Sequence, residues 1–435
     1  MKKLILLLLL IVLLPELYAQ KTDKYITEKN VSRVIKMLTA DEMMGRPASR
    51  PEHIEKATAF IEQEFKKIGL KPLNGLTSFR QEFSKDQIVP LKSEIVIDGE
   101  LISDENFILV TEKTTINESS GLSIRRIELD STASNRDQYF FNAVSTLFND
   151  TTSSIILVAP EFKRSFDELK SYYVKPFTRG RKGLKVLVLG KSSASQYTIK
   201  VTQKIESIKM INVVGQLEGS TKPDEMVVFS GHYDHIGIQK PTDGDSIANG
   251  ADDDASGTTA VIELARYFKK MKNNNRTLIF AAFTAEEVGG FGSQYFSKQL
   301  NPDKVVAMFN VEMIGKPSKW GQNFAFISGY ERSDFGEILK KNLAGTQFEF
   351  KPDPYPEQDL FYRSDNATLA RLGVPAHTIS TDQIDIDPYY HTVNDEVETL
   401  DMKNITSTIR AIALSARSII SGADTPTRID KSTVR

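Results

Sequence analysis

Hydrophobic and polar positions near both ends of the chain follow the period of helices. Apolar residues recur at helical spacing over residues 51–70, and Gly69 and Pro72 mark the end of an amphipathic helix. A second helix is expected from Met402 to about residue 420, with Asp401 as its N-cap. Each of these helices has an apolar face that the rest of the fold must cover.

After residue 200, short apolar runs alternate with a helical pattern. The runs MVVFSGH and LIFAAFT predict strands, and between them Val261, Leu264 and Phe268 lie on one face of a predicted helix. Such alternation is typical of a mostly parallel sheet with helices on its faces. We therefore predict an α/β fold in which a mixed, mostly parallel central sheet is flanked by helices.

A stretch of β-like runs interrupts this pattern at residues 94–200. The sequence EIVIDGELI predicts a hairpin that turns at Asp98 and Gly99, and SIILVAP and KVLVLGK predict further strands. We predict a β-rich domain inserted into a main domain formed by residues 20–93 and 201–422; a lid that shapes the substrate site is the functional alternative. The polar residues 423–435 predict a flexible tail.

The composition is that of an ordinary globular protein, and it argues against nucleic-acid binding and against any role for cysteine chemistry. The chain has 435 residues, of which 40% are hydrophobic and 26% are charged, enough for one large domain and a smaller one. Its net charge of −2 and isoelectric point of about 6.3 provide no basic field for binding nucleic acid. Since cysteine is absent, the protein has neither disulfides nor cysteine-linked lipids.

The first residues have the pattern of a cleavable signal peptide. Lys2 and Lys3 precede an apolar run over residues 4–14, Pro15 ends the run, and Ala19 occupies a small-residue cleavage position. The run is shorter than the roughly twenty residues that span a bilayer, which disfavours the alternative of an uncleaved anchor. We expect residues 1–19 to be removed and the mature protein to be secreted or periplasmic, with no stable membrane anchor.

Acidic and histidine side chains gather where the predicted strands end. The segments MVVFSGHYDH, NGADDDASG, LIFAAFTAEE and MFNVEMIG carry most of them, and YYHTVND adds one far downstream. In open α/β sheets, catalytic groups collect beyond the carboxyl ends of the strands, so we expect these segments to meet in one crevice. Imidazole and carboxylate groups without cysteine suit a divalent ion, zinc above all. The candidates are His232, Asp234, Asp252, Asp253, Asp254, Glu286, Glu287, Glu312 and His391.

Each motif alone has an ordinary structural explanation, such as a solvated turn for the aspartate triplet. Taken together, the candidates occur in an order that resembles the co-catalytic di-zinc exopeptidases. That family includes aminopeptidase Y, the secreted bacterial leucyl aminopeptidases and glutamate carboxypeptidase II. The resemblance covers about residues 27–70 and 200–420 and skips the insert, which in that family often is a protease-associated domain.

The resemblance implies a zinc exopeptidase fold that holds two Zn²⁺ ions per chain. It assigns His232 and Glu312 to the first ion and Glu287 and His391 to the second, with Asp253 as the bridge. It also implies that the peptide bond after Asp253 is cis.

The same resemblance implies catalytic roles for three further residues. Two zinc ions that share a water lower its pKa to about 7, and Glu286 then acts as general base on that water. Asp234 follows His232 by two positions and fixes the tautomer of an imidazole ligand. Tyr390 stabilises the oxyanion of the scissile carbonyl, with a plain core aromatic as the open alternative.

Two positions depart from the family pattern. Glu312 stands where the family usually has aspartate, and its extra methylene moves the carboxylate farther from the backbone. We still expect Glu312 to bind the first ion, because a buried unpaired carboxylate is unfavourable. Asn366 replaces a histidine that relatives often carry, which leaves the wall of the substrate pocket undefined.

The sequence therefore predicts a secreted zinc-dependent exopeptidase, most simply an aminopeptidase that removes N-terminal residues from peptides. The enzymatic alternative is a glutaminyl cyclase, a single-zinc acyltransferase on a related fold, but that branch tends to lose the acidic bridging motif that DDDASG retains. A binding module on a degenerate peptidase scaffold, like the transferrin receptor, is disfavoured because every type of ligand is present. The residue removed, carboxypeptidase action, the role of the insert and the oligomeric state stay open.

Overall fold

The computed structural model describes residues 22–130, 135–173, 176–180 and 183–435. The chain divides into two compact units, a larger one up to Phe83 and from Met210 to Arg435, and a smaller one from Ser84 to Lys209. The predicted signal peptide, residues 1–19, lies outside the described residues. Among those that are described, no helix combines the length and the apolar character that a membrane span requires.

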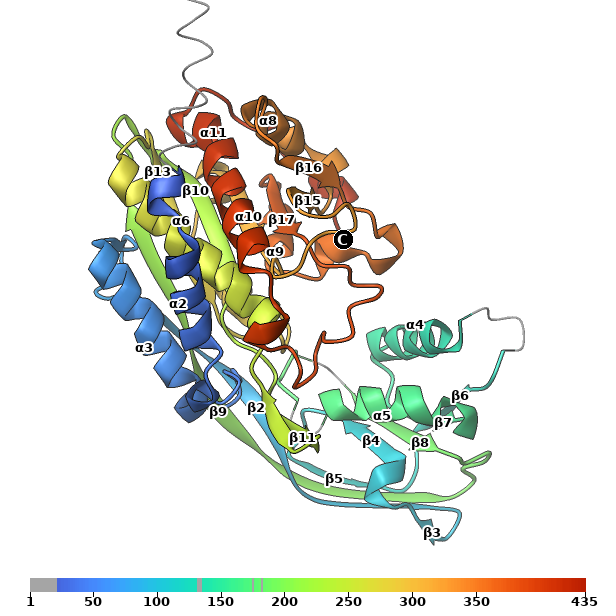
Figure 1. Ribbon diagram of the computed structural model, residues 1–435. Helices are drawn as coiled ribbons and strands as arrows, with labels where there is room; N and C mark the ends of the chain where they lie inside the picture. The colour runs from blue at the N-terminus through green and yellow to red at the C-terminus, as the bar shows by residue number, and fades with distance from the viewer. Residues whose placement is uncertain (1–21, 131–134, 174–175, 181–182) are drawn as a thin grey trace, which may run out of the picture. The chain divides into compact units, whose positions relative to one another are not determined.

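The larger unit is built on a mixed β-sheet (Figure 1). Its strands are β1 Lys71–Pro72, β2 Arg80–Ile97, β9 Tyr197–Leu217, β10 Lys222–His232, β13 Arg276–Phe283, β14 Val305–Val311, β15 Phe324–Ile327, β16 Glu349–Pro352 and β17 Ala376–Ser380, beside a separate pair, β11 Gly237–Thr242 and β12 Asp245–Ala248. The order across the sheet is β16-β15-β17-β14-β10-β13-β9. The pairs within β17-β14-β10-β13 are parallel, whereas β9 and β15 each run antiparallel to the strand that joins them to this group. The predicted α/β fold with a mixed, mostly parallel sheet is confirmed.

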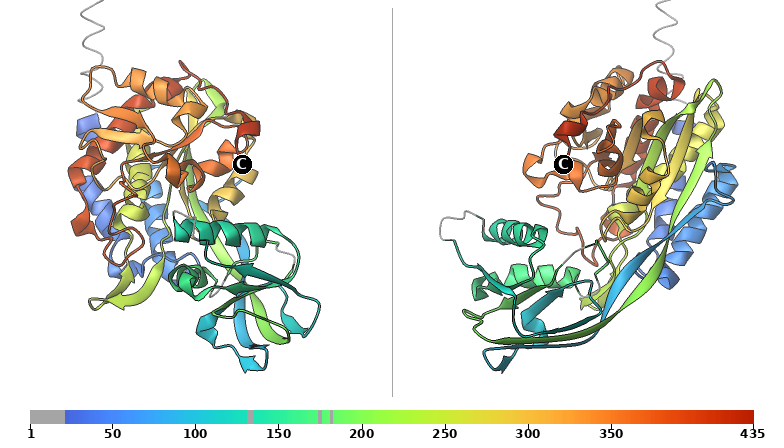
Figure 2. Two further views of the ribbon diagram at one scale, coloured as in Figure 1. Left: turned by 90° about the vertical axis from the view of Figure 1, so that its right-hand side faces the viewer. Right: turned by 180° about the vertical axis from the view of Figure 1, so that it is seen from behind.

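Helices cover both faces of this sheet (Figure 2). One layer consists of α2 Glu28–Leu38, α3 Pro51–Ile68, α6 Gly257–Met271, α8 Phe335–Asn342 and α10 Met402–Ser415, with α11 Arg417–Ser421 after it; α7 Phe291–Lys298 and α9 Asn366–Ala370 lie on the other face. Val227 and Phe229 of β10 belong to the first core, and Val228 belongs to the second. Because β10 is buried on both faces, apolar side chains are needed at successive positions, which explains the run MVVF.

Three phenylalanines fix the register at the centre of the sheet. Phe229 of β10 pairs with Phe280 of β13 and with Phe309 of β14. Its ring stacks on both, with centroid distances of 5.6 and 4.9 Å. Since the three parallel strands are aligned at this level, their carboxyl ends lie next to one another.

The two helices predicted from the pattern are present. Helix α3 ends at Gly69, whose φ of 81° lies in the left-handed region that favours glycine. The predicted closing helix is divided into α10 and α11, and Asp401 caps it by accepting the N–H groups of Lys403 and Asn404.

The prediction of a flexible tail over residues 423–435 is wrong. Ile429 is only 3% exposed, and its N–H donates to the carbonyl of Gly373. The guanidinium of Arg428 donates to the carbonyl of Val305 at 2.8 Å. Two apolar residues in a polar segment, Ile429 and Val434, pack against the core but show no period, so the pattern alone does not identify them.

The smaller unit contains a four-stranded sheet in the order β4-β8-β7-β6 and two helices. Its elements are β3 Glu100–Leu101, β4 Phe107–Val110, β5 Thr115–Glu118, β6 Ser123–Ile127, α4 Arg136–Asn149, β7 Ser154–Val158, α5 Lys163–Tyr172 and β8 Lys185–Leu189. The predicted hairpin forms, with φ of 49° at Asp98 and 79° at Gly99. The unit begins at residue 84, against 94 predicted, and ends at 209, against 200. Strands β2 and β9 run through both boundaries without a turn that the sequence could reveal.

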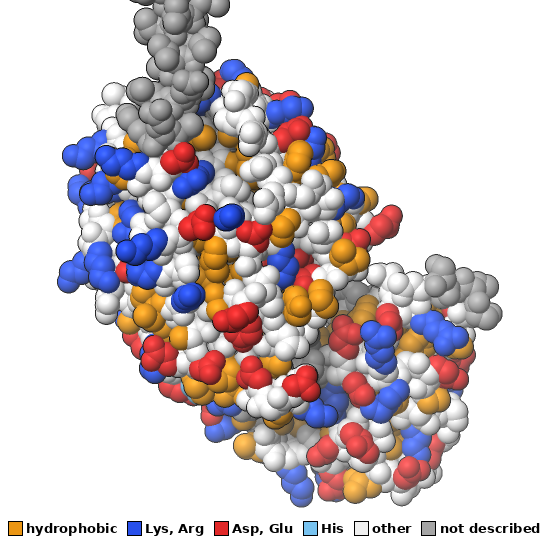
Figure 3. Space-filling view, in the orientation of Figure 1, with side chains coloured by type: hydrophobic (Ala, Val, Ile, Leu, Met, Phe, Trp, Pro, Cys, Tyr) orange, Lys and Arg blue, Asp and Glu red, His pale blue; other side chains and the backbone are white. Residues whose placement is uncertain are grey.

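Charged side chains of both signs are interspersed over the face shown in Figure 3. Among the described residues visible there, neither sign forms a continuous field. This distribution agrees with the small net charge of −2.

Candidate metal centre

The carboxyl ends of three adjacent parallel strands deliver most of the predicted site. His232 is the last residue of β10, Glu286 and Glu287 follow β13 closely, and Glu312 comes directly after β14. Strand β10 lies between β13 and β14, and the connections through α6 and α7 lie on opposite faces of the sheet. The chain therefore changes sides at β10, and such a switch point is where open α/β sheets bind their ligands.

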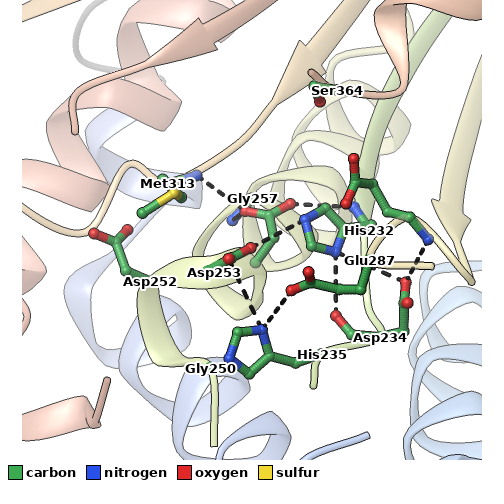
Figure 4. Close-up of polar contacts among 12 residues, drawn as sticks. His232, Asp234, His235, Gly250, Asp252, Asp253, Gly257, Glu287, Met313 and Ser364 are labelled. Carbon is green, nitrogen blue, oxygen red and sulfur yellow. Dashed lines mark hydrogen bonds and ion pairs between the residues drawn. The ribbon is translucent and has the colours of Figure 1, made fainter. Parts of the chain in front are cut away.

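Asp253 enters the centre from the turn η4, Ala251–Ser256, at the start of α6 (Figure 4). The Asp253–Asp254 peptide bond is cis, as the resemblance implied. The carboxylate of Asp254 accepts three backbone N–H groups, from His232 at 3.1 Å, Gly257 at 2.9 Å and Met313 at 3.1 Å. A Cβ at position 257 would lie 2.4 Å from this carboxylate, so glycine is required there. Asp254 therefore ties the ends of β10 and β14 to α6.

Each oxygen of the Asp253 carboxylate faces one histidine. Oδ1 lies 3.1 Å from Nε2 of His232, and Oδ2 lies 3.2 Å from Nε2 of His391. The residue is only 2% exposed. A carboxylate that divides its oxygens between two separate imidazoles has the geometry of a bridge between two cations.

The other predicted ligands complete a set of donors on each side of Asp253. His232, Asp253 and Glu312 bring one donor atom each within 4.8 Å of one another. On the other side, Oε2 of Glu287 lies 3.1 Å from Nε2 of His391. The structure therefore brings the five predicted ligands together in the two groups that the resemblance implied.

These donors fit zinc. Two ligands bound to one tetrahedral zinc ion at about 2.0 to 2.2 Å lie about 3.3 to 3.6 Å apart. The distances of 3.1 and 3.2 Å between the histidine and carboxylate donors are close to this spacing. Nε2 of His232 and Oε2 of Glu312 are buried and have no hydrogen-bond partner among the described residues. Because such buried polar atoms are unfavourable, a cation would satisfy both.

The tautomer of His232 is fixed by a backbone carbonyl, which corrects the predicted role of Asp234. Nδ1 of His232 lies 3.1 Å from the carbonyl oxygen of Asp234 but 3.8 Å from its carboxylate. Donation from Nδ1 to this carbonyl leaves Nε2 available to a metal. The carboxylate of Asp234 instead accepts the N–H of Glu286 at 3.1 Å, so it holds the backbone that carries the predicted base.

Two residues that the sequence did not single out support the ligands. Nδ1 of His235 lies 2.8 Å from Oε1 of Glu287, and this contact orients the glutamate (Figure 4). The carboxylate of Asp395 accepts the N–H groups of Asp252 and Asp253 at 3.0 Å. Asp395 belongs to the YYHTVND segment, in which the sequence predicts functional roles only for Tyr390 and His391.

A second acidic cluster lies on the far side of the Asp252–Asp253 peptide. One carboxylate oxygen from each of Asp252, Asp382 and Asp387 lies within 4.8 Å of the others. Nζ of Lys316 lies 3.0 Å from Asp252 and 2.6 Å from Asp387. Asp252 is therefore not part of the metal centre, and we call the four residues the lysine cluster.

Burial raises the pKa of most carboxyl groups in the metal centre. It raises the pKa of Glu312 and of Asp234 to about 7, and that of Glu286 well above its ordinary value. Burial acts in the same direction on Glu287, but hydrogen bonds from His235 and His391 overcome it and lower that pKa to about 2. So many buried acids favour the binding of cations between them.

Tyr390 lies at the edge of the centre. Its ring stacks on that of His391, with a centroid distance of 4.0 Å and an interplanar angle of 20°. Its hydroxyl accepts a long hydrogen bond of 3.5 Å from Arg363. Burial raises the pKa of Tyr390 above its ordinary value, so the hydroxyl keeps its proton. It is thus more than a core aromatic, since it borders both the ligands and a pocket.

Of the two departures from the family pattern, only Glu312 lies in the centre. Its N–H donates to the carbonyl of Ile379 at 3.1 Å, which holds the residue between β14 and β17. Asn366 is fully buried and donates to the carbonyls of Phe361 and Ala376 at 3.1 and 3.3 Å. It is not among the residues that line the pocket next to Glu312.

Comparison with protein families matches residues 212–416 to Peptidase family M28. A probable leucine aminopeptidase of Trichophyton verrucosum is 31% identical over 216 residues, which cover 47% of this chain and 55% of that protein. A probable zinc metalloprotease of Pyrenophora teres f. teres is 38% identical over 110 residues, which cover 25% of this chain and 23% of that protein. The chain spans about half the length of the leucine aminopeptidases it matches.

Solved structures with a similar fold include two aminopeptidases. The aminopeptidase from Aneurinibacillus sp. strain AM-1 superposes with a TM-score of 0.60 at 18% identity and covers 96% of this chain and 98% of its own. BSAP, a zinc aminopeptidase from Bacillus subtilis, gives a TM-score of 0.55 at 16% identity and covers 94% and 99%. At these identities, the likeness shows the fold.

Proposed function

We propose that this chain is a zinc-dependent aminopeptidase that hydrolyses the first peptide bond of its substrates, and the match of residues 212–416 to Peptidase family M28 supports this proposal. The observation that carries the proposal is the position of the Asp253 carboxylate, with one oxygen 3.1 Å from His232 and the other 3.2 Å from His391. Glu312 and Glu287 add one carboxylate to each side. This is a donor set for two ions that share one bridging ligand.

Five residues would hold two zinc ions. They are His232 and Glu312 on one side, Glu287 and His391 on the other, and Asp253 between them. Bound there, zinc lowers the pKa of a coordinated water and polarises a carbonyl. The backbone contacts of Asp254 and Asp395 keep this set in place, because they fix the turn that carries Asp253.

Glu286 is proposed as the general base that moves the proton. Its backbone N–H is held by Asp234 at 3.1 Å, and its neighbour Glu287 is held by His235. Glu286 would take a proton from the attacking water and return it to the leaving amine. Burial raises its pKa well above the ordinary value, which suits a group that must both accept and release a proton.

Tyr390 is proposed to donate a hydrogen bond to the carbonyl oxygen that gains charge. It keeps its proton because burial raises its pKa, and its ring lies against His391. A donor beside the ligands would stabilise the charge that develops on the carbonyl oxygen during peptide hydrolysis.

The choice of an aminopeptidase over a carboxypeptidase rests on what similar proteins are called. The relatives in Trichophyton and Arthroderma are named probable leucine aminopeptidases, and the two similar structures are aminopeptidases. Secretion rests on a separate feature, the pattern of residues 1–19. We infer that the mature protein acts on peptides outside the cytoplasm.

Zinc content and substrate hydrolysis, measured on the same preparation, test this proposal. We expect close to two zinc ions per chain, hydrolysis of aminoacyl p-nitroanilides, no hydrolysis of their N-acetylated forms, and loss of activity on chelation. Cleavage of the blocked forms alone would contradict aminopeptidase action. Release of ammonia from N-terminal glutamine with one zinc would indicate a glutaminyl cyclase, and no turnover of any substrate by zinc-loaded protein would indicate a binding module.

A further inference from the structure

A pocket opens next to the metal centre. Glu312 and Tyr390 belong both to the centre and to the wall of this pocket. Met313, Phe326, Leu360 and Ile384 give the wall an apolar character. A peptide whose first carbonyl lies at the metal centre would therefore place the side chain of its N-terminal residue here.

One carboxylate interrupts this apolar wall. Asp382, in the loop after β17, lines the pocket and is only 3% exposed. No amide, hydroxyl or ammonium group of the described residues donates a hydrogen bond to its carboxylate oxygens, and its contact within the cluster is with the carboxyl group of Asp387. A buried carboxylate without a cationic partner is unfavourable, so this wall favours a ligand that offers a positively charged donor.

The charges around Asp382 leave it available for such a ligand. In the lysine cluster, Nζ of Lys316 contacts Asp252 at 3.0 Å and Asp387 at 2.6 Å. Its contacts are thus made with the other two carboxylates, although Asp382 belongs to the same cluster. Among the described residues, no lysine or arginine forms an ion pair with Asp382.

We propose that Asp382 selects peptides whose N-terminal residue is basic, lysine or arginine, by pairing with the cationic end of that side chain. The inference rests on the proposed aminopeptidase function and specifies its substrate class. The methylene groups of a lysine side chain match the apolar wall, and the ammonium matches the buried carboxylate. A leucine side chain satisfies the wall and leaves the carboxylate without a partner.

Two further groups bear on this proposal. Burial and the neighbouring Asp252 and Asp387 raise the pKa of Asp382 to about 9, so a bound cation also stabilises the ionised form of this carboxyl group. Arg363 lines the pocket as well, but it is exposed, and its guanidinium donates to Gln358 at 3.1 Å. Water screens an exposed charge more strongly than a buried one, so Asp382 acts more strongly than Arg363 on a charged ligand in the pocket.

Substrates of equal length but different charge test the proposal. The zinc-loaded protein is assayed with lysyl, arginyl, norleucyl and leucyl p-nitroanilides. Norleucine has the straight apolar chain of lysine without the ammonium, so the ratio of kcat/KM for lysyl over norleucyl isolates the charge. We expect this ratio to be about 10 to 100, the range for a hydrogen bond to a charged group.

Asp382→Asn removes the charge and keeps the shape. It should bring the lysyl-to-norleucyl ratio close to one, whereas Asp385→Asn, an exposed acid in the same loop, should leave the ratio of the wild type. The ratio of the wild-type protein tests the proposal even if Asp382→Asn does not fold.

Three outcomes decide the matter. A wild-type ratio of one or below, or an unchanged ratio in folded Asp382→Asn, overturns the role of Asp382 and leaves the aminopeptidase function standing. Absence of turnover with every unblocked substrate, in protein loaded with zinc, overturns the proposed function and this inference with it. A ratio well above one that is lost only in Asp382→Asn establishes the assignment.

Discussion

Two acidic clusters lie on either side of the Asp252–Asp253 peptide, and they differ in what supplies positive charge to their buried carboxylates. The lysine cluster places Nζ of Lys316 within 3.0 Å of two of its carboxylates. The metal centre gathers Asp253, Glu287 and Glu312 around His232 and His391, and among the described residues no lysine or arginine forms an ion pair with these three carboxylates. The lysine cluster therefore contains its own cation, whereas the metal centre is suited to a metal ion that binds from solution.

A metal site differs from a structural ion cluster in the source of its positive charge. Burying several carboxylates is unfavourable unless positive charge accompanies them. Where a lysine supplies that charge, the acids are part of the scaffold. Where only imidazoles and unpartnered polar atoms face the acids, the arrangement is that of ligands, and Nε2 of His232 and Oε2 of Glu312 are such atoms.

The largest expected effect comes from Glu286→Gln. Glu286 lies in the metal centre but is proposed to act as base and not as ligand. The change should lower kcat by about two to four powers of ten and leave both zinc ions bound. Activity assays together with zinc analysis check this, and Glu287→Gln serves as the matched comparison, because it should lose zinc. Loss of zinc from Glu286→Gln instead would mean that the roles of these neighbours are exchanged.

Glu312 allows a sharper test of the two groups of ligands. Glu312→Ala should lower the zinc content from close to two ions toward one, because only the site with His232 loses a donor. Glu312→Asp should retain zinc, since the shorter carboxylate is the usual choice of the family. Zinc titration of both variants measures this, and an unchanged content in Glu312→Ala would remove Glu312 from the ligand set.

A substitution in the lysine cluster should lower the stability of the protein and leave its zinc content unchanged. Lys316→Met removes the cation and leaves Asp252 and Asp387 without their partner. Breaking a buried ion pair in this way costs about 3 to 5 kcal/mol of unfolding free energy. Denaturant unfolding at fixed zinc concentration checks the loss, and zinc analysis of the folded variant should still give two ions. Loss of zinc from folded Lys316→Met would show that the clusters are not separate.

A third buried acid gives the smallest effect. Glu64, only 1% exposed, contacts Arg33 at 2.6 Å, Arg266 at 2.8 Å and Lys67 at 3.1 Å. Although burial opposes it, hydrogen bonds from these cations lower the pKa of Glu64 to about 2. A depressed pKa contributes stability above the pKa of the unfolded chain, and this stability is lost as pH falls toward 2.

Glu64→Gln should therefore destabilise the protein by about 2 kcal/mol at pH 7, the range for hydrogen bonds to charged groups. The difference from the wild type should shrink between about pH 4.5 and the pKa of about 2, where the wild-type carboxylate is itself protonated. Unfolding measured as a function of pH checks this. A difference that stays constant across this range would contradict the ionic role of Glu64.

The sequence pattern was sufficient for the main elements, and the family resemblance for the grouping of the candidate ligands. Helix α3, the alternation of strands and helices, and the acidic ends of β10, β13 and β14 all follow from local periods. The supporting contacts were not accessible in this way, because they join distant residues. The carboxylate of Asp395 accepts the N–H of Asp252 although the two residues are 143 positions apart. Lys316 pairs with the carboxylate of Asp252 from 64 positions away.

The aspartate triplet shows most clearly where local reasoning ends. Asp252, Asp253 and Asp254 are adjacent in sequence, but each carboxylate goes to a different place. The first pairs with Lys316, the second faces the two histidines, and the third accepts three backbone N–H groups. The local pattern does not distinguish them, since all three are the same residue in the same turn; the resemblance singled out Asp253, and the fold shows the contacts of the other two.

Anomalous diffraction at the zinc edge, from crystals of the zinc-loaded protein, locates the ions relative to the two clusters. We expect two peaks, one on each side of the Asp253 carboxylate, at about 2.0 to 2.2 Å from His232 and Glu312 and from Glu287 and His391 respectively. We expect no peak between Asp252, Asp382 and Asp387, where Lys316 lies. A peak in the lysine cluster, or a single peak that does not contact Asp253, would contradict this expectation.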